Sequence, residues 1–89
     1  MLKTFVLPMV LSLQLFAMSA SMNMPLIKDV DYGYPTSGKE AVSMVMNGQA
    51  CLLDKGEEVV NMDSSFSYYK VRGRVSGCIG WAPKEYFKL

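Results

Sequence analysis

The sequence predicts a small all-β barrel of five to six short strands, preceded by an N-terminal signal peptide. Short runs rich in β-branched and aromatic residues recur after residue 48, and turns of Gly, Asn, Asp and Ser separate them. No long helical period follows residue 21. The chain has 89 residues, which is enough for one domain. Together these observations favour a single small antiparallel barrel.

Residues 1–21 are predicted to be the signal peptide. Lys3 precedes an apolar run over residues 5–18, which is shorter than the ~20 residues of a membrane span and is typical of a secretory leader. The small residues Ala17, Ser19 and Ser21 allow cleavage after Ser19 or after Ser21. A cleaved chain would be secreted or periplasmic, with no lasting membrane anchor. An uncleaved N-terminal anchor is the alternative.

The domain is expected to begin with a loop-rich segment over residues 22–40, in which residues 25–30 form a first short strand. The barrel core is expected over residues 41–89. Val42, Met44 and Met46 alternate with other residues, which favours a strand over residues 41–46, although their Met and Ala content leaves a short helix open. Asn47 and Gly48 then predict a tight turn.

Further strands are predicted over residues 49–53, 57–62, 67–72 and 78–83, and residues 84–89 end the chain. Side chains alternate between the two faces of a strand, so Tyr69 and Val71 share one face while Tyr68 and Lys70 share the other. Val71 is the natural core residue of this strand. Tyr68 is therefore expected on the more exposed face.

Cys51 and Cys78 are the two cysteines of the chain. In a small exported domain, two cysteines most often form one disulfide, which here would close a loop of about 27 residues and contribute roughly 3 kcal/mol. Two buried free thiols are the alternative. A disulfide would matter because a core of this size is only marginally stabilising.

The last 40 or so residues resemble the bacterial SH3-like (SH3b) domain, in its exported two-cysteine form. The resemblance rests on a first turn with Gly56, an aromatic-x-x-Val strand from Tyr68 to Val71, and a Gly-x-x-Gly-Trp element from Gly77 to Trp81. It implies an SH3-like barrel in which these residues are structural: Gly56, Val71, Gly77, Gly80 and Trp81. It also supports the Cys51–Cys78 disulfide, because exported members carry cysteines at the same places. Trp81 offers the largest apolar surface for the core, where we expect it.

The resemblance also implies a ligand groove. SH3-type domains bind extended peptides in a shallow groove of aromatic residues and a proline. Tyr68, Pro83 and Tyr86 match that groove, and the spacing of aromatic residues suggests that Tyr32 and Tyr34 complete it from a loop. The family implies peptidoglycan peptide or an extended segment of an envelope protein as the partner.

The composition argues against catalysis and against several classes of ligand. The chain has no histidine, so the commonest general base and metal ligand is missing, and two cysteines alone make a poor zinc site. We therefore expect no enzyme activity, no cofactor and no metal. Without Lys3, basic and acidic side chains are equal in number, which disfavours nucleic-acid binding. The function predicted is an exported binding module of the cell envelope; the alternative is a small structural or inhibitory subunit that docks on a larger envelope protein.

Overall fold

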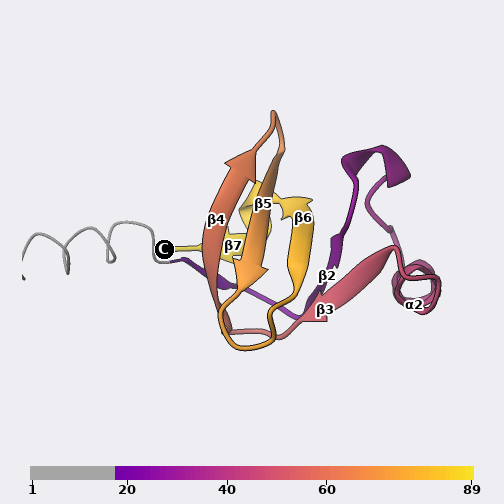
Figure 1. The fold of residues 1–89 in the computed structure, drawn as a ribbon, viewed down its shortest axis with the longest axis horizontal. Helices are drawn as coiled ribbons and strands as arrows, with labels where there is room; N and C mark the ends of the chain where they lie inside the picture. The colour runs from indigo at the N-terminus through magenta and orange to yellow at the C-terminus, as the bar shows by residue number, and fades with distance from the viewer. Residues whose placement is uncertain (1–17) are drawn as a thin grey trace, which may run out of the picture.

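A computed structural model describes residues 18–89 as a small barrel-like domain, which confirms the all-β prediction (Figure 1). Seven strands form one antiparallel sheet in the order β3-β2-β6-β5-β4-β1-β7. The strands are β1 (Met18–Ala20), β2 (Met24–Ile27), β3 (Ala50–Leu53), β4 (Glu58–Ser64), β5 (Tyr68–Gly73), β6 (Ile79–Pro83) and β7 (Phe87–Lys88). One α-helix, α2 (Gly38–Met46), and two short 3-10 helices, η2 (Val30–Tyr32) and η3 (Lys84–Tyr86), complete the described part.

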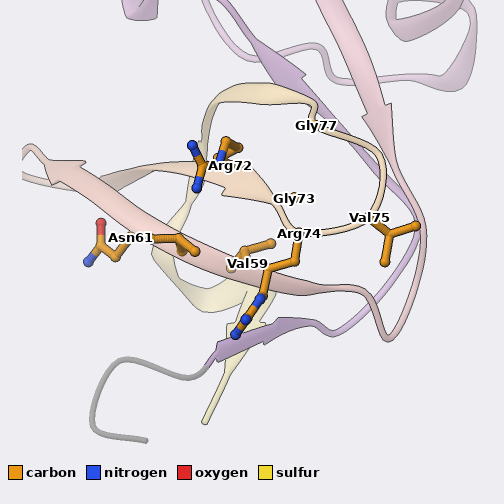
Figure 2. Close-up of a pocket in the computed structure, with 8 residues that line it drawn as sticks. Val59, Asn61, Arg72, Gly73, Arg74, Val75 and Gly77 are labelled. Carbon is orange, nitrogen blue, oxygen red and sulfur yellow. The ribbon is translucent and has the colours of Figure 1, made fainter. Parts of the chain in front are cut away.

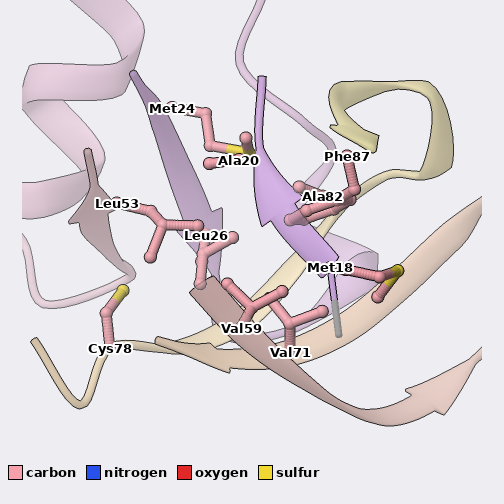
Figure 3. Close-up of a cluster of buried hydrophobic side chains, with 10 residues drawn as sticks. All are labelled: Met18, Ala20, Met24, Leu26, Leu53, Val59, Val71, Cys78, Ala82 and Phe87. Carbon is pink, nitrogen blue, oxygen red and sulfur yellow. The ribbon is translucent and has the colours of Figure 1, made fainter. Parts of the chain in front are cut away.

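The core lies on the inner face of the curved sheet (Figure 3). In β5, Val71 and Gly73 are buried and Tyr69 is half-buried against the core, while Tyr68 belongs to the other face. The face assignment made from the sequence therefore holds. Ten buried residues from the strands and the loop before β6 make up the cluster: Met18, Ala20, Met24, Leu26, Leu53, Val59, Val71, Cys78, Ala82 and Phe87.

Trp81 is not a member of this core, contrary to our expectation. It is only half-buried and shares its face of β6 with Ile79 and Pro83, whereas Gly80 and Ala82 point inward. The reason is the close approach of β2. A Cβ atom at Gly80 would lie 2.6 Å from the Ile27 carbonyl oxygen, so this register admits only the smallest side chain on the inner side.

Residues 41–46 form most of α2 instead of the strand that the alternation favoured. Ser37 caps the helix, because its side chain accepts a hydrogen bond from the backbone N–H of Glu40 (3.1 Å). The Glu40 carboxylate in turn accepts one from the Thr36 N–H (2.8 Å). The half-buried positions of the helix, Ala41, Met44 and Val45, follow the helical period and not the strand period. Figure 1 shows α2 beyond β3, away from β4 and β5.

Strand β1 comes from residues that the sequence assigned to the signal peptide. It lies between β4 and β7, and Met18 and Ala20 are buried in the core. The Ala20 N–H donates to the Glu57 carbonyl (3.0 Å), and the Ala20 carbonyl accepts from the Gly56 N–H (2.8 Å). The predicted boundary at residue 21 therefore falls inside the folded part. Residues 1–17, where the rest of the predicted leader lies, are outside the described residues.

Cys51 and Cys78 form a disulfide, as predicted, with their Cα atoms 5.8 Å apart. It ties the edge strand β3 to the segment that leads into β6. Two glycines near the bridge have positive φ: Gly56 (87°), in the turn between β3 and β4, and Gly77 (77°), directly before Cys78. Within residues 18–89, no helix is long and apolar enough to cross a membrane.

Candidate functional site

Tyr34 lies at the centre of a cluster of three tyrosine rings. Its ring is 6.3 Å from that of Tyr68 and 5.7 Å from that of Tyr86, measured between centroids, and both contacts are edge-to-face. All three side chains are half-buried. Edge-to-face pairs of this kind stabilise beyond their buried area by about 0.5–1.5 kcal/mol each. The rings therefore form one continuous aromatic surface.

Pro83 joins this surface from the neighbouring strand. It pairs in register with Tyr68, so their side chains lie on the same face of the β5–β6 ladder. Pro83 ends β6 and is the residue directly before η3, a place at a strand end that tolerates its missing N–H. That single turn carries Tyr86 back over the barrel toward Tyr34. We name Tyr34, Tyr68, Pro83 and Tyr86 the tyrosine cluster.

The hydroxyl groups of the three tyrosines differ in their hydrogen bonding. The Tyr34 hydroxyl donates to the Pro25 carbonyl (2.7 Å), which fixes its ring against β2. Burial raises the pKa of Tyr34 far above its usual value, and the neighbouring Tyr86 and Tyr68 add to the shift, so Tyr34 stays a neutral donor. The hydroxyls of Tyr68 and Tyr86 make no hydrogen bond within residues 18–89. They can therefore bond to a ligand.

Two open cavities flank Tyr34. One, of 220 Å³, lies between Tyr34 and Tyr86 and is also lined by Pro25 and Pro35. It extends the apolar surface of the tyrosine cluster with two prolines that the sequence reading did not assign to the site. The position of Pro35, directly after Tyr34, was the one signal in the sequence for its inclusion.

The other cavity, of 460 Å³, shares Tyr34 and Pro35 with the first and is also lined by Tyr32 and Glu40. Tyr32 is exposed at the end of η2, and it is not in ring contact with the three clustered tyrosines. Hydrogen bonds from the backbone and side chain of Thr36 lower the pKa of Glu40, so this second cavity has an anionic edge. Of the five predicted ligand-binding residues, the structure brings Tyr34, Tyr68, Pro83 and Tyr86 together and places Tyr32 beside them.

The chemistry available at the tyrosine cluster is that of a binding surface. It offers ring faces and edges, prolines and two phenolic hydroxyls, which suit apolar and planar groups. Lys84, next to Pro83, is turned toward another ring: its Nζ lies 5.2 Å from the centre of the Tyr69 ring, outside the cluster. Among residues 18–89, no three His, Cys, Asp or Glu side chains are grouped closely enough to hold a metal ion.

Comparison with known proteins adds no relative: no family model matches the chain, and neither a curated protein nor a solved structure matches it. The tyrosine cluster is therefore assigned as a candidate site from the structure of this chain alone.

Proposed function

We propose that this protein is a non-catalytic, SH3-like binding module that holds an extended peptide on the tyrosine cluster. The observation that carries the proposal is the packing of Tyr34 against both Tyr68 and Tyr86, with Pro83 opposite Tyr68. These residues come from separate segments of the chain, and three of them are the ones that the SH3b resemblance implies. An extended peptide suits such a surface because it presents its apolar side chains without first having to fold.

The surface also has the burial expected of a preformed site. Tyr34 is held by its hydrogen bond to Pro25, so the rings are ordered before a ligand arrives. Tyr68 and Tyr86 remain half-exposed and keep their hydroxyls free of partners within the described part. Rigid aromatic side chains with a polar tip supply much of the binding energy at protein interfaces.

We place the protein in the cell envelope, secreted or periplasmic, with peptidoglycan peptide or an extended segment of an envelope protein as its ligand. The Cys51–Cys78 disulfide supports this placement, because disulfides persist in oxidising compartments. The SH3b resemblance supports the ligand class.

Retention on purified peptidoglycan tests the proposal. We expect the protein to be retained, and Tyr68→Ala and Tyr86→Ala each to weaken binding about 30-fold, since truncating a binding hot spot costs ~2 kcal/mol or more. Phe66→Ala removes an exposed aromatic residue outside the tyrosine cluster and should bind like the unaltered protein. Circular dichroism checks that each variant is folded.

If Tyr68→Ala and Tyr86→Ala are both retained as strongly as the unaltered protein, the tyrosine cluster has no role in binding. Absence of retention, together with recovery of one stoichiometric envelope protein, would instead support the alternative of a docking subunit. Tyr32→Ala tests whether the ligand also occupies the 460 Å³ cavity. This variant should bind more weakly only if the ligand extends from Tyr34 into that cavity.

A further inference from the structure

A larger cavity, of 710 Å³, lies at the other end of β5 from the tyrosine cluster (Figure 2). Tyr68 begins β5 and Arg72 stands four residues further along it, which corresponds to about 13 Å of extended chain. The two sites are therefore separate. The cavity is lined by residues of β4, β5 and the turn that follows β5: Val59, Val60, Asn61, Arg72, Gly73, Arg74, Val75 and Gly77.

The cations of β5 and of the turn after it have different neighbours. Lys70 pairs in register with Asp63, and the Arg74 guanidinium lies 3.7 Å from the Glu58 carboxylate. Arg72, by contrast, stands opposite Val60 on β4 and Ile79 on β6. It forms no ion pair with residues 18–89. Among residues 18–89, Arg72 therefore has apolar residues in register on both neighbouring strands and no carboxylate within ion-pair distance.

Two carboxylates lie near the turn beside the cavity, and both have partners: Glu58 pairs with Arg74, and Glu57 bonds to the turn backbone. Glu57 accepts hydrogen bonds from the backbone N–H groups of Ser76 (2.7 Å) and Val75 (3.1 Å). These bonds, that from Ser76 above all, lower the pKa of Glu57, so it stays ionised and holds the turn in place. The turn that supplies Val75 to the cavity wall is thereby fixed, and Glu57 is engaged away from Arg72.

We infer that this cavity binds a small organic carboxylate with an apolar group next to the charge. A guanidinium binds a carboxylate through two parallel hydrogen bonds, and Arg72 has that capacity free. Val60 and the exposed Val75, which line the same cavity, offer apolar contact for the rest of the ligand. The volume lies within the range of small-molecule sites, ~300–1,000 Å³. This carboxylate site is independent of the function proposed for the tyrosine cluster.

Octanoate is the first probe, titrated into the disulfide-bonded protein at low salt and followed by amide chemical shifts. We expect saturable binding with shifts at the residues that line the cavity. Octanamide lacks the charge and acetate lacks the apolar chain, so each should bind at least about tenfold more weakly. Arg72→Gln should weaken octanoate binding about tenfold or more. Lys70→Gln, which removes the cation that faces Asp63, should change it less than about twofold.

The carboxylate can come from a fatty acid or from the end of a peptide, and a second probe separates these sources. An acetylated tripeptide ending in leucine with a free carboxylate is compared with its C-terminal amide. Tighter binding of the tripeptide acid than of octanoate identifies a peptide terminus, and the reverse order identifies a fatty acid. Tyr68→Ala should leave both affinities unchanged, which keeps this test distinct from that of the tyrosine cluster. Absence of saturable binding, equal binding of octanamide, or full affinity in folded Arg72→Gln would overturn the inference.

Discussion

Gly80 shows how one residue sets the spacing of two strands. Its inner side faces the backbone of β2, and a Cβ atom there would meet the Ile27 carbonyl oxygen at 2.6 Å and Leu26 atoms at 2.8 Å. Only glycine permits this approach without a shift of one strand. The same crossing explains why Trp81 faces outward, since a large inward side chain has no room beside β2.

Gly80→Ala should therefore lower the free energy of unfolding by about 1–3 kcal/mol, the usual cost of forcing extra atoms into a packed site. Gly38→Ala is the matched control, because a Cβ at Gly38 meets no atom within 4 Å and its φ is not positive. Urea denaturation of both variants measures the difference. Equal stability of the two variants would contradict the role assigned to Gly80.

At the level of single residues, the sequence predicted the tyrosines better than the tryptophan. The two-residue period assigned Tyr68 to the face opposite Val71, and the SH3b resemblance grouped Tyr68 with Pro83, with which it pairs in register. The position of Trp81 depends on which face of β6 meets β2, and that is decided by a contact between strands far apart in the chain.

Among the elements, α2 was only the alternative to a strand over residues 41–46, although a signal for its start is present in the sequence. Ser37 is followed three residues later by Glu40, and a Ser-x-x-Glu sequence before an apolar run marks a helix start. Residues 41–46 satisfy a two-residue alternation as well as the helical period, so local composition alone did not decide between them. The cap decides it, because it satisfies N–H groups that an isolated turn would leave without partners.

Strand β1 was missed for a different reason. Small and apolar residues suit both the end of a leader and the inside of a barrel, and Met18–Ala20 satisfies both descriptions. What decides its place is pairing with β4 and β7, which no local pattern reveals.

Ala20→Asp tests whether β1 belongs to the fold. Ala20 is fully buried, so an unpaired carboxylate there should destabilise the domain by several kcal/mol. Ser19→Asp, on the half-exposed side of the same strand, should cost much less. Thermal unfolding followed by circular dichroism compares the two. If both variants have the same unfolding temperature as the unaltered protein, β1 contributes nothing to stability.

At the level of the whole molecule, the disulfide compensates for a small core. No described residue larger than Leu, Ile or Val has less than 2% of its surface exposed, so apolar burial alone stabilises this domain modestly. The bridge spans 27 residues and encloses β4 and β5 entirely. It restricts the unfolded chain over the segment that contains every residue lining the larger cavity and Tyr68 of the tyrosine cluster.

Replacing Cys51 and Cys78 together by alanine should lower the free energy of unfolding by roughly 3 kcal/mol, as the chain-entropy argument predicts for this loop. Urea denaturation of the variant, and of the unaltered protein with and without reductant, measures the loss. A midpoint that reduction leaves unchanged would show that the bridge is dispensable.

The pairing of β1 with β7 has a mechanical consequence. Ser19 pairs with Lys88 and Ala20 with Phe87, so in this antiparallel ladder residue 18 and residue 89 lie at the same end. A tension applied between those two points pulls the strands apart sideways and breaks their hydrogen bonds one after another, not all at once. The barrel opens first along this seam, while the Cys51–Cys78 bridge keeps the 27-residue segment that contains β4 and β5 from extending. Under tension, the strands β1 and β7 therefore separate first, and residues 51–78 stay closed by the disulfide.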